Sequence, residues 1–168
     1  MRIKDIVIIG MLGAVLLAIQ VVFAFLPNIE LISLLIIIYT LILGRNTVFV
    51  IYVFVTLEGL FYGFGLWWIN YLYVWMILFI VVRLFKKKSS PVFWALICGL
   101  FGIAFGALCA IPNLFLGGIP SAFAYWVYGI PFDIAHGISN FILTVVLFKP
   151  LYYIMHWLFR REEAFTLQ

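Results

Sequence analysis

Residues 67–88 read WWINYLYVWMILFIVVRLFKKK, a long apolar stretch that ends in a cluster of basic residues. No charged residue occurs between Trp67 and Val82. A helix that crosses the hydrocarbon core of a bilayer needs about 20 predominantly apolar residues. Lys and Arg accumulate at the cytoplasmic ends of such helices. This stretch therefore predicts a membrane-spanning helix whose C-terminal end faces the cytoplasm.

The composition of the whole chain favours the same class. Hydrophobic residues make up 68% of the 168 residues and charged residues 10%, whereas soluble domains are closer to half apolar and a quarter charged. A water-soluble fold could not bury so much apolar surface. We predict a single all-α domain over residues 1–168, an integral membrane bundle of six transmembrane helices. Their approximate ranges are 5–26, 29–43, 46–62, 67–85, 91–111 and 131–159.

The basic residues lie at one set of predicted helix ends. They are Arg2, Lys4, Arg45, Arg83, Lys86, Lys87, Lys88, Lys149, Arg160 and Arg161. The predicted connections on the opposite side contain no Lys or Arg. This positive-inside pattern predicts a multi-pass cell-membrane protein with both termini in the cytoplasm. The net charge is +4, but the basic residues are confined to the predicted cytoplasmic side, so we do not expect nucleic acid as a partner.

The longest predicted outer connection covers residues 113–130. It is apolar, contains Gly117, Gly118 and Pro120, and ends in a group of aromatic residues. Such a loop either anchors its aromatic side chains at the membrane interface or folds over the bundle as a lid. Pro131 suits the first turn of the last helix. Pro150 predicts a kink near the inner end of that helix.

Polar side chains within the predicted spans gather in the outer half of the bundle. Asp133, His136 and Asn140 are spaced by three and then four residues, which places them on one face of the last helix. Glu58 and Asn70 lie in the outer parts of the third and fourth helices. Because ionisable groups in a membrane are costly, they usually face a cavity or a partner. The pattern predicts a one-sided outer pocket for a flat heteroaromatic ligand.

Each of these polar residues also has a structural alternative. Asp133 could cap the last helix, Glu58 could pair with His136, and Asn70 could bond to a neighbouring helix. An acid–base role for Asp133 and His136 would require a nucleophile elbow or oxyanion glycines, and the sequence offers neither. No H-E-x-x-H motif supplies further metal ligands. We therefore expect no enzyme activity, no metal and no cofactor.

Small residues recur at every fourth position on two predicted helices. They are Gly10, Ala14 and Ala18 on the first, and Cys98, Gly102, Gly106 and Ala110 on the fifth. Such strips let another helix approach closely. One strip is sufficient for packing within the bundle. The second either packs inside as well or offers a surface to another protein.

These features resemble the substrate-binding S component of an energy-coupling factor (ECF) transporter. The resemblance covers the whole chain and begins with its size and its six predicted helices. It includes Ala14 and Ala18, and the segment Pro-Asn-Ile-Glu at 27–30 before a short aliphatic helix. It also includes Pro-Phe-Asp at 131–133, which leads to His136 and Asn140.

The resemblance implies a binding subunit for a vitamin or related micronutrient in a prokaryotic plasma membrane. It also implies a transmembrane coupling protein and two ATPase subunits as partners, with docking through Gly10, Ala14 and Ala18. ATP hydrolysis would occur in those partners, since this sequence has no GxxxxGK[ST] phosphate loop. The substrate-binding residues expected on this basis are Glu58, Tyr62, Asn70, Tyr71, Trp126, Asp133, His136 and Asn140.

Two acidic groups in the pocket favour a cationic or hydrogen-bond-donating ligand. Pyrimidine, pyridine and thiamine-like compounds fit this description, and a corrinoid is a further alternative. A different function is also open, that of a structural or assembly protein that binds a partner through its small-residue faces without a ligand. A self-sufficient small transporter or channel is less favoured, because a channel needs polar residues through the full depth of the bundle.

Overall fold

The computed structural model describes residues 3–165, with side chains through Phe159, so Arg2 and the side chains of Arg160 and Arg161 lie outside the described part. Helices make up nearly all of this part, and the predicted all-α class is confirmed for it. The elements are α1 (Ile3–Phe23), α2 (Ile32–Leu43), the 3-10 turn η1 (Gly44–Asn46), α3 (Thr47–Tyr62), α4 (Leu66–Leu84), α5 (Pro91–Cys109) and α6 (Ile111–Phe165).

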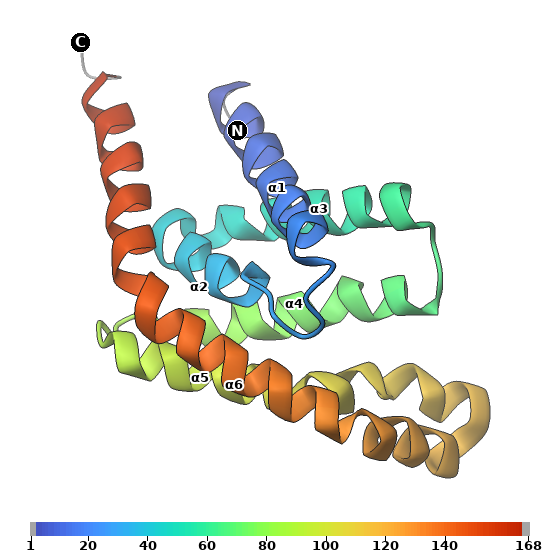
Figure 1. Ribbon diagram of the computed structural model, residues 1–168. Helices are drawn as coiled ribbons and strands as arrows, with labels where there is room; N and C mark the ends of the chain where they lie inside the picture. Colours follow the sequence, from blue (N-terminus) through green and yellow to red (C-terminus); the bar gives the residue numbers. More distant parts are fainter. Residues whose placement is uncertain (1–2, 166–168) are drawn as a thin grey trace.

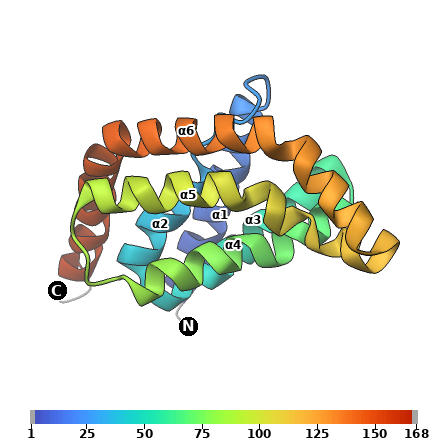
Figure 2. The same ribbon diagram turned by 90° about the horizontal axis from the view of Figure 1, so that it is seen from below.

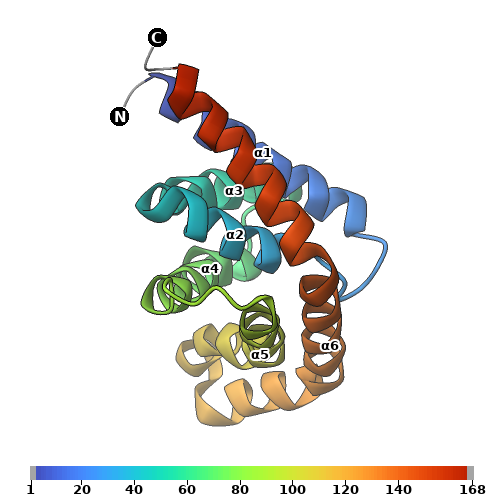
Figure 3. The same ribbon diagram turned by 90° about the vertical axis from the view of Figure 1, so that its left-hand side faces the viewer.

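The helices form two groups with different directions. α3, α4, α5 and the middle of α6 run roughly alongside one another (Figure 1), whereas α1 and the last part of α6 cross them at a steep angle (Figure 3). The α2–α3 and α4–α5 connections lie at one end of the first group, and the α3–α4 connection lies at the other (Figures 1 and 2). The basic residues after α2 and α4 therefore share one end of the molecule.

Five stretches of the described residues are long and apolar enough to cross a membrane. They are Ile3–Phe23, Ile32–Tyr62, Leu66–Leu84, Pro91–Cys109 and Ile111–Phe159. α2 alone has 12 residues, fewer than the roughly 17 that the shortest spans need. The chain reverses direction between α2 and α3 (Figure 1), where Gly44 has a φ of 61°. A sixth span and the side of the membrane that holds the termini stay predictions.

The prediction of a loop over residues 113–130 is wrong. This segment is helical except at Gly117 and Gly118, where the backbone leaves helical geometry and the chain turns back. Gly118 adopts a φ of 70°, which glycine reaches without strain. Pro120 follows in the first turn after this break, where a missing N–H is tolerated. The helix then continues through Pro131, which lies inside α6 and not at its start.

α6 also bends in its last third, between its orange and red portions in Figure 1. Pro150 lies within this part of the helix. A proline inside a helix removes one backbone hydrogen bond and clashes with the preceding turn, which bends the helix. The bend agrees with the kink predicted from the sequence.

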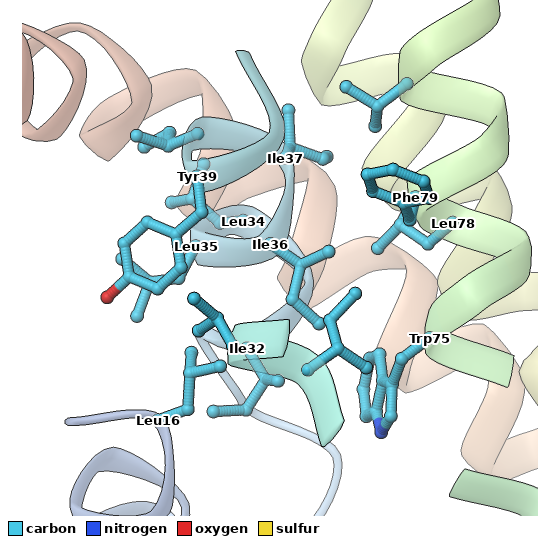
Figure 4. Packing of buried hydrophobic residues seen from close by; sticks show 14 of the residues in the cluster. Leu16, Ile32, Leu34, Leu35, Ile36, Ile37, Tyr39, Trp75, Leu78 and Phe79 are labelled. Carbon is cyan, nitrogen blue, oxygen red and sulfur yellow. The ribbon is translucent and has the colours of Figure 1, made fainter. Parts of the chain in front are cut away.

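α2 forms the centre of the core. All residues from Ile32 to Thr40 are buried, as expected for a helix that is apolar on every side. Figure 4 shows Ile32 beside Leu16 of α1, with Trp75 and Leu78 of α4 on the other side of α2. This central position explains why α2 is almost wholly aliphatic.

The two strips of small residues have different surroundings. A Cβ atom built on Gly102 of α5 would lie 2.8 Å from the Cα of Gly137 in α6, so the α5 strip packs inside the molecule. Ala14 and Ala18 of α1 are exposed, and a Cβ built on Gly10 would meet nothing within 4 Å. Only the α1 strip therefore remains available to another protein.

We expect Gly102→Ala to lower the free energy of unfolding by about 1–3 kcal/mol, the usual cost of overpacking. The added methyl group would meet backbone atoms of His136 and Gly137, which cannot move aside without separating α5 from α6. Thermal unfolding of the detergent-solubilised protein measures the effect. Gly10→Ala is the matched control, and it should leave stability unchanged or raise it by up to about 1 kcal/mol. Equal melting temperatures for both variants would contradict the close α5–α6 contact.

Candidate functional site

A cavity of about 230 Å³ lies at the end of the bundle away from the α4–α5 connection. The end of α1 and the connection from α1 to α2 form one side of it. The opposite side is formed by Tyr71 and Trp75 of α4, Phe105 of α5, and Asp133 and His136 of α6. Four helices and one connection therefore meet around this space.

Glu30 and His136 form a hydrogen-bonded pair at the edge of the cavity. The Oε1 atom of Glu30 lies 3.2 Å from Nε2 of His136. Because an ionised carboxylate only accepts hydrogen bonds, Nε2 must carry the proton in this pair. Burial alone would raise the pKa of Glu30, but the hydrogen bond and charge of His136, together with Ser33, hold it below its ordinary value of 4.5. Glu30 is therefore ionised at neutral pH.

Further hydrogen bonds fasten the α1–α2 connection to α6. Ser33 donates to Glu30 through its backbone N–H (2.9 Å) and its hydroxyl (2.5 Å). Asn140 Nδ2 in turn donates to the Ser33 hydroxyl oxygen at 3.3 Å. The Ser139 hydroxyl donates to the backbone carbonyl of Asn28 at 2.6 Å. These bonds hold Glu30 at the N-terminus of α2, where the helix dipole favours a negative charge.

Two residues of the cavity lining each carry a buried polar atom that has no hydrogen-bond partner among the described residues. The carboxylate of Asp133 accepts from the backbone N–H of Gly106 at 2.9 Å through Oδ1, while Oδ2 is buried and unpaired. The indole Nε1 of Trp75 is also buried and unpaired. An unsatisfied buried polar group costs about 1–3 kcal/mol. A ligand that donates to Asp133 and accepts from Trp75 would satisfy both atoms.

Aromatic side chains surround these polar atoms. The ring of Phe105 meets the His136 ring edge-to-face at 5.1 Å and lies 5.7 Å from that of Trp75. Tyr71 contacts Trp75 edge-to-face at 5.4 Å. Because these rings hold one another in place, they form a firm apolar wall against which a flat ligand can pack.

Three of the predicted site residues line this cavity, namely Tyr71, Asp133 and His136. Asn140 is buried and reaches Glu30 through Ser33. Asp133 does not cap a helix, because it lies inside α6 and binds the backbone of α5. His136 pairs with Glu30, so the alternative pairing with Glu58 is not observed.

The other four predicted residues are not part of the cavity lining. Glu58 is buried on α3, with an Oε1 atom that has no hydrogen-bond partner in the described part of the chain. Asn70 is buried and accepts a hydrogen bond from Tyr73 of its own helix at 3.1 Å, so the alternative of a bond to a neighbouring helix is not observed. Tyr62 and Trp126 are exposed, at 47% and 39% of their surface.

Sequence reasoning missed Glu30, Trp75 and Phe105 as lining residues. Glu30 carried a signal, since it precedes Ser33 by three residues at the start of the most apolar helix. Trp75 and Phe105 carried none, because aromatic residues are frequent throughout this chain.

Within the described residues, no three His, Cys, Asp or Glu side chains come close enough to hold a metal ion. Fold and cavity together define an all-helical protein with apolar helices long enough to cross a membrane and a small polar cavity among them. Comparison with protein-family models, with curated proteins and with solved structures gave no match. We therefore infer its function from the cavity itself.

Proposed function

We propose that this protein is the substrate-binding S component of an ECF-type importer, which captures a vitamin or related micronutrient at the outer face of a prokaryotic plasma membrane. A coupling protein and two ATPase subunits would complete the transporter. The observation that carries the proposal is a cavity lined by Asp133 and Trp75, each with an unpaired buried polar atom, beside the Glu30–His136 pair. Such a site favours a ligand with both a hydrogen-bond donor and an acceptor.

The distribution of buried charge supports binding and delivery over conduction. Among the described residues, the acidic and imidazole side chains that are buried or nearly buried are those of Glu30, Glu58, Asp133 and His136. The rest of the core consists mainly of aliphatic and aromatic side chains from α2, α4 and α5. A channel would need polar groups through the whole depth. A binding subunit needs them only where the ligand is held.

The size of the cavity narrows the class of ligand. Drug-sized ligands occupy pockets of about 300–1,000 Å³, whereas this cavity measures about 230 Å³. A corrinoid is too large for this volume. A single heteroaromatic ring with a donating or cationic group fits the aromatic wall, the Asp133 carboxylate and the Trp75 indole. Pyrimidine and pyridine derivatives are the compounds that meet these conditions best.

The exposed small-residue strip of α1, formed by Gly10, Ala14 and Ala18, supports the second part of the proposal. α1 packs against the rest of the protein through Ile9, Leu12, Gly13 and Leu16, which leaves the strip on its other side. Small residues allow a helix of another protein to approach the backbone closely. We assign this strip to the coupling protein.

Mass spectrometry of small molecules that co-purify with the protein tests the proposal. We expect a heteroaromatic compound, which on titration quenches tryptophan fluorescence because Trp75 lines the cavity. Trp75→Phe should retain the fold and lose most of the quenching. If neither co-purified compounds nor a panel of pyrimidines and pyridines binds, the alternative of a partner-binding membrane protein without a ligand would replace this proposal.

A further inference from the structure

A second cavity, of about 370 Å³, lies at the opposite end of the bundle. Lys86, Lys87 and Lys88 after α4 and Lys149 of α6 form part of its wall. Figures 1 and 2 both show the α4–α5 connection beside the bend of α6. Lys149 follows Asp133 by roughly four helical turns, so this cavity is separate from the candidate ligand site.

Among the described side chains, no acidic group accompanies the positive charges around this cavity. No Asp or Glu lines the cavity, and no ion pair involving these four lysines occurs within the described part of the chain. Four lysines in the wall of one space repel one another and create a positive potential. An anion that enters the space would relieve this repulsion.

The remaining wall is aromatic and apolar. Trp94 and Phe148 are buried, and Tyr152 stacks on Phe148 with 5.7 Å between ring centroids and an interplanar angle of 11°. α5 begins here with Pro91, so the positive end of its helix dipole adds to the lysine charges. A cationic rim above an apolar wall matches a molecule that carries both an anionic group and a hydrocarbon part.

The position of the cavity along the spans favours a lipid. Lys86–Lys88 follow directly after the apolar helix α4, at the depth where a span leaves the hydrocarbon and enters the headgroup region. Basic pockets between membrane helices on the cytoplasmic side are known to bind anionic headgroups. A soluble anion would use the lysines but would gain nothing from Phe148 and Tyr152.

We infer that this cavity binds the phosphate group of an anionic lipid headgroup, with the start of the acyl chains against Phe148 and Tyr152. The lipid joins the α4–α5 connection to the bend of α6. This site is independent of the proposed vitamin-binding function, because the two cavities share no lining residue.

Native mass spectrometry of the full chain in detergent tests the inference by titration with phosphatidylglycerol, phosphatidylcholine and glycerol 3-phosphate. Phosphatidylglycerol is expected to bind at least tenfold more tightly than the other two. Lys149→Gln should weaken its binding about fivefold, and Lys87→Gln combined with Lys149→Gln about 25-fold, since each lysine near an anionic headgroup contributes a similar share.

Arg45→Gln is the matched control. Arg45 is exposed and lies at the same end of the molecule as Lys86–Lys88, but it does not line the cavity. This variant should change phosphatidylglycerol binding less than twofold. Equal losses for Arg45→Gln and Lys149→Gln would overturn the site. If phosphatidylcholine bound as tightly as phosphatidylglycerol, the site would not select an anionic headgroup. If glycerol 3-phosphate bound as tightly as phosphatidylglycerol, the ligand would not be a lipid.

Discussion

Asp133→Asn is expected to weaken ligand binding by between tenfold and a hundredfold while the protein remains folded. Asparagine keeps the oxygen that accepts from the Gly106 N–H at 2.9 Å. It removes the negative charge and turns the unpaired acceptor Oδ2 into a donor. Hydrogen bonds to charged groups contribute about 1.5–3 kcal/mol, and every 1.4 kcal/mol is a factor of ten in Kd.

Fluorescence titration with the co-purified compound measures this loss, and thermal unfolding shows whether the fold is retained. His136→Ala should also weaken binding at least tenfold, because it removes the partner of Glu30. His156→Ala is the matched control, since His156 packs beside Tyr152 and lines neither cavity. An unchanged Kd for Asp133→Asn would remove Asp133 from the ligand site.

The same fluorescence titration with Glu58→Gln tests separately whether Glu58 contacts the ligand, as the sequence predicts. A tenfold loss would extend the ligand site from the cavity toward α3, where the unpaired Oε1 of Glu58 is buried. An affinity close to that of the unmodified protein would limit the site to the residues that line the cavity.

Ala14→Trp is expected to abolish uptake of the ligand into cells or proteoliposomes that contain the complete transporter. Ala14 is exposed in the small-residue strip of α1, and an indole ring there would hold a partner helix away from the backbone. Ligand binding to the isolated protein should be unchanged, because Ala14 does not line the cavity. Uptake assays and fluorescence titration separate the two effects.

Val15→Trp is the matched control for this prediction. Val15 is 38% exposed on the same helix and lies about 100° around the helix axis from Ala14. This variant adds an indole ring to α1 beside the strip and not over Ala14, and uptake should persist. Normal uptake with Ala14→Trp would exclude the strip as the docking surface, and equal loss in both variants would point to a general effect of bulk on α1.

The helical content, the presence of helices long and apolar enough to cross a membrane, and most helix ends could be predicted because they depend on local sequence. An apolar run, a basic flank or a proline near a helix end acts over a few residues. The structure of segment 113–130 was harder to predict, since its glycines and proline indicate a turn but do not show how many residues the turn includes. The break is confined to Gly117 and Gly118, and the residues that follow return to a helix.

The polar residues on one helix were also predictable in part. The spacing of Asp133, His136 and Asn140 places them on one face of α6, and all three are buried. Their partners come from distant parts of the chain. Asp133 binds the backbone of α5, and no local pattern distinguishes the N–H of Gly106 from its neighbours.

Length, hydropathy and flanking charge are properties of each segment alone, and they predict an all-helical, strongly apolar protein whose basic residues mark one set of helix ends. The contact between Glu30 and His136, 106 residues further along the chain, arises only when the helices pack together. The same packing buries the α5 strip and leaves the α1 strip exposed. These outcomes depend on how α1, α2, α5 and α6 pack against one another, and packing is set by the shapes of all their side chains together.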